Sequence, residues 1–443
     1  MAATVYALAT APGRGAVAVL RLSGPEAGGA VEALTGRPPP PPRRAALRRL
    51  RDPASGETLD QALILYFAAP SSFTGEDVAE LHLHGGRAVT AGVVAALARL
   101  PGLRPAEPGE FTRRAFQNGR MDLTEAEAVA DLVAAETAAQ RRQSLRQLDG
   151  ELGRLYEHWR ARLVRALAHL EADIDFPDED LPSGVAPAVR PVLEGLRAEI
   201  AAHLADGRRG ERLREGCHVA ILGAPNVGKS SLLNALARRD VAIVSSRAGT
   251  TRDVIEVHLE LGGFPVILAD TAGLREGADE IEAEGIRRAR SRAQGADLKL
   301  AVFDATALPA LDAETLALVD DDTLVVVNKT DRACLGRDVE IAGRRPIQVS
   351  ALGGGGMAYL LERLEAAVAD RLAPGGAPTL TRARHRDALE SCLADLTRAL
   401  AAELPELAAE DTRLAMRALG RITGRVDVED LLDVIFRDFC VGK

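Results

Sequence analysis

One short loop of the sequence combines the residue types that bind nucleotide phosphates. Residues 223–230 read GAPNVGKS, a complete GxxxxGK[ST] pattern between the apolar run CHVAIL and a helix expected from Ser231 to Ala237. In such a loop the glycines let backbone N–H groups face the phosphates, the lysine reaches the outer phosphates and the hydroxyl ligates Mg²⁺. The helix adds the positive end of its dipole. We therefore expect nucleotide contacts from Gly223, Asn226, Val227, Gly228, Lys229, Ser230 and Ser231.

Three further motifs follow in order, each after an apolar, strand-like run: DTAG after PVILA, NKTD after TLVVV and SAL after PIQV. An aspartate in the first can hold Mg²⁺ through water, and its glycine can meet the γ-phosphate. Asp331 can accept two hydrogen bonds from guanine N1–H and its amino group, which adenine cannot offer. Together the motifs specify GTP, with expected contacts from Asp270, Thr271, Ala272, Gly273, Asn328, Lys329, Asp331, Ser350, Ala351 and Leu352.

The loop between the phosphate-binding helix and the next strand has the composition of a switch. Residues 244–253 read VSSRAGTTRD, and Thr251 is the expected second hydroxyl on the Mg²⁺ side. Many small GTPases orient the attacking water with a glutamine directly after DTAG. Here that residue is Leu274, so another group must orient the water. The acidic stretch Glu276–Glu284 is the nearest source of a carboxylate, although from the residues alone a solvated helix start is the favoured interpretation.

The bulk properties limit the class of protein. A chain of 443 residues predicts two or three domains, and 47% hydrophobic with 27% charged residues is typical of a soluble protein. We expect neither a membrane span nor a secretory signal. Four scattered cysteines without a CxxC pair favour a reducing cytoplasm over a disulfide or zinc framework. A net charge of −9 argues against wholesale coating of nucleic acid, so any RNA contact must be local or made through a partner protein.

The four lysines among 55 basic residues are informative, because arginine has replaced lysine almost everywhere. A remaining lysine marks a candidate site that needs a compact point charge. Lys229 and Lys329 lie in the nucleotide motifs and Lys443 lies at the C-terminus. Lys299, within DLKLAVFD, is expected to be an ordinary strand-edge residue.

The elements that must position these residues fall into four segments. Residues 1–119 read as mixed α/β, with strands near 16–22 and 62–67 and a helix near 89–100. Residues 120–214 read as helical, with Thr124 and Glu127 as a capping box and one apolar stripe of Leu145, Leu148, Leu152, Leu155 and Trp159. Residues 215–372 alternate strands and helices, and residues 373–443 are helical again. Linkers are expected at 177–187 and 374–378. We predict a P-loop GTPase domain inserted into a helical domain.

The motifs GAPNVGKSSLLN, AGTTRD, DTAGLR and NKTD and the terminal FCVGK resemble the MnmE (TrmE) family of tRNA modification GTPases. The resemblance covers essentially the whole chain, including PGEFTRRAFQNGRMDLTEAEAVADL in the first part. It implies a Ras-like GTPase domain and an N-terminal α+β domain that mediates homodimerisation. The resemblance also implies that this domain binds formyl- or methylene-tetrahydrofolate, with contacts carried over onto Arg21, Glu80, Arg120 and Lys443. Arg120 stands where lysine is usual.

The same resemblance implies hydrolysis that depends on potassium. The K⁺ ligands carried over are Asn226, Ser245, Arg247 through its carbonyl, and Thr250, with Ser230 and Thr251 on Mg²⁺. Water orientation is assigned to Glu282, which reverses the interpretation of the acidic stretch as a solvated helix start.

The implied partners are tRNA and an FAD-containing flavoprotein of the MnmG type. The resemblance implies that this chain and the flavoprotein form a heterotetramer, and that together the proteins install an aminomethyl-type (carboxymethylaminomethyl) group at carbon 5 of the wobble uridine. It also implies that GTP hydrolysis opens and closes paired GTPase domains. Cys440 matches the family's C-terminal cysteine, either as a nucleophile toward uracil or as a packing residue near the folate pocket.

Two other functions are consistent with parts of the sequence. A ribosome-assembly GTPase of the Era or Der kind shares the PNVGKS-type loop but ends in a KH-like domain, and no GXXG loop in a βα context is evident in this C-terminus. A non-catalytic GTP-binding scaffold would be consistent with Leu274 and the lack of an arginine finger. Potassium-stimulated turnover that is lost in Glu282→Ala would distinguish an enzyme from a scaffold.

Overall fold

The computed structural model describes residues 3–175, 189–238, 256–270, 294–333, 336, 339–373, 375, 378–426, 429–437 and 439–442. The chain forms two compact units. Unit 1 contains residues 1–133, 147–176 and 409–443, and unit 2 contains residues 134–146 and 177–408. Each of the two predicted helical segments, 120–214 and 373–443, is split between the two units. The predicted division into four segments therefore stays a prediction. Both predicted linkers, 177–187 and 374–378, lie wholly or mostly outside the described residues.

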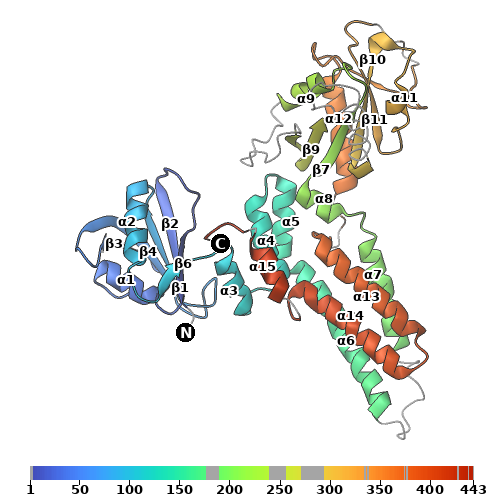
Figure 1. The fold of residues 1–443 in the computed structure, drawn as a ribbon. Helices are drawn as coiled ribbons and strands as arrows, with labels where there is room; N and C mark the ends of the chain where they lie inside the picture. The colour runs from blue at the N-terminus through green and yellow to red at the C-terminus, as the bar shows by residue number, and fades with distance from the viewer. Residues whose placement is uncertain are drawn as a thin grey trace, which may run out of the picture. The chain divides into compact units, whose positions relative to one another are not determined.

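Unit 1 begins with a six-stranded sheet in the order β3-β4-β5-β2-β1-β6 (Figure 1), in which β1 and β6 are parallel and the other pairs are antiparallel. Two helices pack on one face, where alternate strand residues form a core with both of them. The strands predicted near 16–22 and 62–67 and the helix predicted near 89–100 are present with shifted ends. The elements are β1 Thr4–Leu8, β2 Val17–Ser23, α1 Ala27–Thr35, β3 Ala46–Arg51, β4 Thr58–Phe67, β5 Val78–His84, α2 Arg87–Leu97 and β6 Leu103–Pro105.

The remainder of unit 1 is helical. A small core joins α4 to the C-terminal helix α15 through Leu123, Ala126, Leu432, Phe436 and Phe439. The helices are α3 Glu110–Gln117, α4 Leu123–Ala134, α6 Glu151–Asp175, most of α14 Pro405–Thr423, and α15 Glu429–Arg437.

The capping box predicted at Thr124 and Glu127 is wrong by two residues. Asp122 accepts the Glu125 N–H at 2.9 Å, and Glu125 accepts the Asp122 N–H at 2.7 Å. Thr124 lies inside α4 and donates to Asp122 at 2.7 Å. Both pairs have the spacing of a capping box, but an aspartate at the cap satisfies the free N–H groups and begins the helix earlier.

The apolar stripe predicted from Leu145 to Trp159 is interrupted. Helix α5, Ala138–Leu148, ends before Gly150, whose φ of +79° breaks the helix, and α6 begins at Glu151. Leu152 and Trp159 are buried, whereas Leu145 is 41% exposed. The stripe was therefore correct for α6 but wrong for Leu145, because a turn separates the two helices.

Unit 2 contains the predicted α/β domain, a six-stranded sheet in the order β12-β11-β10-β7-β9-β8. All neighbours are parallel except β8 and β9. Helices α9 and α12 share one core with the sheet, and α11 packs with a second core (Figure 1). The elements are β7 Cys217–Leu222, α9 Lys229–Ala237, β8 Glu256–Leu261, β9 Phe264–Asp270, β10 Leu298–Asp304, η1 Ala305–Ala307, α11 Ala313–Leu316, β11 Thr323–Asn328, β12 Ile347–Gln348 and α12 Met357–Leu372.

The helices of unit 2 precede and follow this sheet in sequence. Helix α7, Arg190–Leu204, packs on α13, Ala383–Ala401, and α8, Arg209–Glu215, leads into β7. Arg386 of α13 forms ion pairs with Asp206 at 2.9 Å and with Glu211 of α8 at 3.0 Å. Among the described residues, every helix is too short or too polar to cross a lipid bilayer.

Lys299 is not a strand-edge residue. Strand β10 lies between β7 and β11, and the Lys299 side chain is nearly buried. Its ammonium contacts Asp320 at 2.5 Å. Alternation of residue types does not reveal whether a strand is central or peripheral, which explains the error.

Candidate functional site

The phosphate-binding loop needs its glycines for space. Gly223 has φ +152°, and a Cβ there would lie 2.5 Å from the Val302 carbonyl. Gly228 has φ +100°, and its Cβ would lie 2.3 Å from the Asn328 amide nitrogen. The loop therefore passes close to β10 and to the end of β11, where a larger residue would push it away.

Lys229 is held across this loop. Its side chain is buried, and its ammonium donates to the carbonyls of Gly223 at 2.7 Å and Ala224 at 2.8 Å. Phosphate oxygens are stronger acceptors than these carbonyls, so a bound nucleotide can take over the ammonium. Ser230 is exposed in the first turn of α9, so its hydroxyl fits a hard cation such as Mg²⁺.

Asn328 connects the phosphate loop to the base-recognition motifs. It is 2% exposed, donates to the Val227 carbonyl at 2.9 Å and accepts the Ala351 N–H at 3.0 Å. A buried amide with both ends satisfied fixes its neighbours in place. The structure thus brings three of the predicted motifs into one site.

Asp331 is oriented for a donor ligand. The Ser350 hydroxyl donates to one of its carboxylate oxygens at 2.6 Å and accepts the Gly353 N–H at 2.9 Å. The Ser350 hydrogen bond holds the pKa of Asp331 below its ordinary value. An ionised, half-exposed carboxylate can accept two N–H donors of guanine. Leu352 beside it is 80% exposed.

Lys329 adds a contact that the motifs did not predict. It has φ +63°, and its ammonium donates to the Asn226 carbonyl at 2.7 Å and to Asp304 at 2.6 Å. Burial would raise the pKa of Asp304, but hydrogen bonds from Lys329 and Thr306 outweigh it and lower the pKa. Sequence reasoning missed Asp304, although its position directly after an apolar strand was a usable signal.

Several predicted residues lie outside the described residues: Ser245, Arg247, Thr250, Thr251, Thr271, Ala272, Gly273, Glu282 and Lys443. Of Asp270, only the backbone at the end of β9 is described. The predicted K⁺ set and the water-orienting glutamate therefore stay predictions.

In unit 1, Arg21 and Glu80 face each other on β2 and β5. The Arg21 guanidinium donates to one Glu80 oxygen at 2.9 and 3.0 Å, and both side chains are largely buried. The guanidinium also lies 5.6 Å from the ring of Phe73 and 5.8 Å from that of Phe111. The Phe111 ring is fully buried and supports the guanidinium from the core side. The carboxylate, the guanidinium and the partly exposed Phe73 ring fit a flat heterocycle with N–H and carbonyl groups.

Arg120 is placed near the loop that carries Phe73. Its side chain is exposed, and a Cβ on Gly75 would lie 3.2 Å from its Cγ. Asn118 donates to the Thr74 carbonyl at 2.8 Å and holds this loop on the end of α3. Neither aromatic residue was predicted, because nothing in the local sequence distinguishes them from core residues.

The C-terminal segment docks on the loop that precedes α3, the helix that carries Phe111. Val441 forms an antiparallel bridge with Pro108, and the Cys440 carbonyl accepts the Gly109 N–H at 3.4 Å. Cys440 is exposed. Cys217 and Cys392, in contrast, are buried, and burial raises the pKa of each thiol to about 12. Of these three thiols, only that of Cys440 is accessible to a reactant.

Two family models cover nearly all of the chain. Residues 4–120 match the model described as the GTP-binding protein TrmE N-terminus. Residues 123–440 match the model described as the MnmE helical domain, and this range includes the α/β sheet with its nucleotide motifs.

Curated relatives match along the full length. A tRNA modification GTPase MnmE from Paramagnetospirillum magneticum is 61% identical over 443 residues, which is 100% of both chains. That from Parvibaculum lavamentivorans is 59% identical over 99% of this chain and 100% of its own. That from Rhodospirillum rubrum is 57% identical over 99% of both. With the nucleotide motifs assembled around Asn328 and full-length identity at this level, the chain belongs to the MnmE family of tRNA modification GTPases.

Proposed function

We propose that this protein hydrolyses GTP with Mg²⁺ and K⁺ in the cytoplasm. With an FAD-containing partner of the MnmG type, it installs an aminomethyl-type (carboxymethylaminomethyl) group at carbon 5 of the tRNA wobble uridine. GTP hydrolysis drives opening and closing of the GTPase domains in a homodimer. The observation that carries the proposal is the Asn328 bridge, which joins the phosphate loop to the guanine motif in a member of this family.

The nucleotide site supports a division of roles. Lys229 and the loop N–H groups bind the phosphates, Ser230 and Thr251 bind Mg²⁺, and Asp331 selects guanine. K⁺ would be held by oxygen ligands from Asn226, Ser245, Thr250 and the Arg247 carbonyl. A fixed cation there neutralises charge that develops during phosphoryl transfer, and Glu282 orients the attacking water.

The Arg21–Glu80 pair supports a folate site. Glu80 can accept N–H donors of a pteridine, while Arg21 and the partly exposed Phe73 ring pack against it. Tetrahydrofolate, when bound, supplies the one-carbon unit. Arg120 and Lys443 add positive charge that suits the carboxylates of a folate tail. Cys440 acts either on the uracil ring or as a packing residue.

The apolar residues on β2, β3 and β4 that face away from the main core of the N-terminal sheet support the homodimer. Ala62 and Ile64 point into the core, so Leu63 between them points to the opposite face. Leu63 is 38% exposed and its cross-strand partner Leu47 is 63% exposed, and Val17 on β2 is 55% exposed. A second copy of this domain would bury such apolar side chains. Light scattering should show a dimer that Leu47→Asp with Leu63→Asp converts to monomer.

Nucleoside mass spectrometry tests the pathway. tRNA from a strain that lacks this chain should lose the carboxymethylaminomethyl-type wobble uridines. The wild-type chain should restore them and Lys229→Ala should not. Unchanged wobble uridines after deletion would refute the assigned pathway.

Hydrolysis assays distinguish the enzyme from a GTP-binding scaffold. Turnover should rise when Na⁺ is replaced by K⁺ and should be lost in Glu282→Ala while GTP binding is retained. Equal turnover in both cations would remove the potassium site from the proposal.

A further inference from the structure

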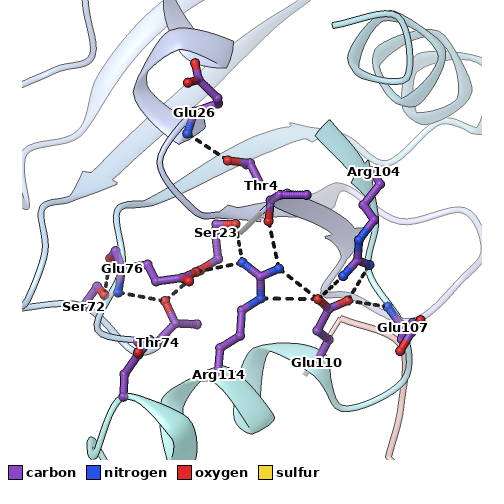
Figure 2. A network of polar contacts seen from close by, with 12 residues as sticks. Thr4, Ser23, Glu26, Ser72, Thr74, Glu76, Arg104, Glu107, Glu110 and Arg114 are labelled. Atoms are coloured by element: carbon purple, nitrogen blue, oxygen red, sulfur yellow. Dashed lines mark hydrogen bonds and ion pairs between the residues drawn. The ribbon is translucent and has the colours of Figure 1, made fainter. Parts of the chain in front are cut away.

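A charged network lies buried beneath the N-terminal sheet of unit 1 (Figure 2). Arg114 of α3 is its centre and is only 8% exposed. Its guanidinium donates to Glu110 at 2.9 Å, to Glu76 at 2.9 Å, to the Ala3 carbonyl at 2.8 Å and to the Ser23 carbonyl at 3.3 Å. One side chain thus joins the helix to β1, β2 and the loop before β5.

Glu110, the first residue of α3, connects this network to the preceding loop. It is 7% exposed and accepts Arg104 of β6 at 2.5 and 2.8 Å. It also accepts the backbone N–H of Glu107 at 2.9 Å. Because Arg104 precedes the loop and Glu110 follows it, the carboxylate holds residues 105–109 at both ends (Figure 2).

The C-terminal segment docks on this same loop. Pro108 pairs with Val441, and Gly109 donates to the Cys440 carbonyl. Gly109 has φ +67°, and a Cβ there would lie 2.9 Å from the Phe436 carbonyl and 3.0 Å from the Phe439 Cβ. The fit therefore depends on the backbone path of the loop to within a few tenths of an ångström.

Attaching the short helix α3 to the sheet does not require a network of buried charges. Well-packed apolar residues of similar volume often stabilise a fold as well as a buried ion pair does. Unlike apolar packing, a hydrogen-bonded carboxylate fixes the direction of each donor group around it. Burial would raise the pKa of Glu110, but hydrogen bonds from Arg104, Glu107 and Arg114 outweigh it and lower the pKa, so the carboxylate stays ionised.

We propose that Glu110, oriented by Arg114 and Arg104, is a positioning residue for the C-terminal segment. It holds the loop 105–109 in the shape that accepts Cys440 and Val441, and it thereby sets where the Cys440 thiol lies. The consequence for tRNA modification rests on the proposed function, whereas docking of the segment can be measured independently.

Hydrogen exchange on the full-length protein tests docking. Peptides covering 105–112 and 436–443 should exchange about tenfold faster or more in Glu110→Gln, because charge-assisted hydrogen bonds that hold the loop are lost. Asp60→Asn is the matched control: Asp60 is a buried carboxylate of the same sheet that accepts the His84 backbone N–H at 2.9 Å and does not contact the loop. Unchanged exchange at both peptides in Glu110→Gln would overturn the proposal, as would equal acceleration in Asp60→Asn.

A covalent tether separates positioning from a purely structural role. A Pro108→Cys, Val441→Cys disulfide joins a bridged pair within disulfide reach. In purified, oxidised Glu110→Gln it should restore slow exchange and wobble-uridine modification in a reconstituted reaction, and reduction should abolish the rescue. GTP hydrolysis should stay within about twofold throughout, as expected for independent sites. Slow exchange without restored modification would show that Glu110 acts other than through the segment. If Cys440→Ser modifies tRNA normally while exchange follows the prediction, the catalytic alternative for Cys440 fails and the positioning role of Glu110 stands.

Discussion

The nucleotide site and the docking site of the C-terminal segment are built from the chain in different ways. The nucleotide site takes its residues from loops that follow neighbouring strands of one sheet, β7, β10, β11 and β12. The docking site joins segments at opposite ends of the sequence, as the Arg113–Asp433 ion pair does across 320 positions. Local sequence motifs therefore predict the first site, whereas the second site forms only once the chain has folded.

The two sites also use charge differently. Lys229 contacts backbone carbonyls that a phosphate can replace, and Asp331 remains half-exposed. Glu110 and Arg114 are buried and fully engaged with one another. Charges available to a ligand indicate binding, and charges satisfied within the protein indicate positioning. Substitutions in each site should therefore change different observables.

The largest effect is expected from Lys229→Ala. Removing the ammonium that we propose neutralises the outer phosphates should slow single-turnover GTP hydrolysis by about 10²-fold or more. Exchange at the C-terminal segment should not change. Lys299→Arg is the control, because Lys299 pairs with Asp320 away from the loop. Hydrolysis near the wild-type rate in Lys229→Ala would remove the basis for the nucleotide site.

Asp331→Asn should change which base is bound. Losing the proposed charge-assisted hydrogen bonds to guanine should weaken GTP binding about 10–100-fold. The new amide N–H can donate to the C2 carbonyl of xanthine, so xanthosine triphosphate should bind better than to the wild type. Titration with fluorescent analogues of both nucleotides measures this. Equal loss for both bases would mean that Asp331 does not read the base.

Gly109→Ala should release the C-terminal segment and leave nucleotide binding unchanged. The added Cβ meets Phe436 and Phe439, so exchange at 436–443 should accelerate about tenfold. Gly119→Ala is a matched control, since Gly119 has φ +66° but no atom within 4 Å of its Cβ. It carries the backbone strain, about 1–2 kcal/mol, without the clash. If exchange at 436–443 is similar in both variants, the acceleration results from backbone strain alone and not from the clash with Phe436 and Phe439.

Asp304→Asn should have a modest effect confined to the nucleotide site. The Lys329–Asp304 pair is partly exposed, so its loss should cost about 1 kcal/mol, or about fivefold in GTP affinity. Asp320→Asn removes the comparable Lys299 pair outside the site and should leave GTP affinity unchanged. A loss of affinity in both variants would indicate general destabilisation of the domain.

The smallest effect concerns pH and the cysteines. Burial raises the pKa of Cys217 and Cys392 to about 12, so the folded state keeps both protonated while the unfolded state ionises above about pH 8.5. Their contribution to stability is complete below that pH and declines above it, by about 0.8 kcal/mol per thiol at pH 9. Denaturant titrations of Cys392→Ala at pH 7 and pH 9 should show a smaller decline than the wild type.

The sequence by itself determined the fold class, the GTP motifs and the family. Glycine spacing, strand-end carboxylates and FCVGK are local patterns, and each depends on only a few neighbouring residues. The helix cap at Asp122 and the exposure of Leu145 were mispredicted. Caps and turns are decided by competition between neighbouring residues, and several residues nearby offered equivalent signals.

Only the tertiary structure decided which distant residues meet. The contact of Lys329 with Asp304, the rings of Phe73 and Phe111 around Arg21, and the docking of Cys440 at Gly109 depend on sheet order and on segments far apart in sequence. Glu110 and Arg114 had the spacing of an ordinary helix-surface ion pair. Burial against β1, β2 and β6 makes them a positioning network, because a charge removed from water must be fully satisfied by the chain around it.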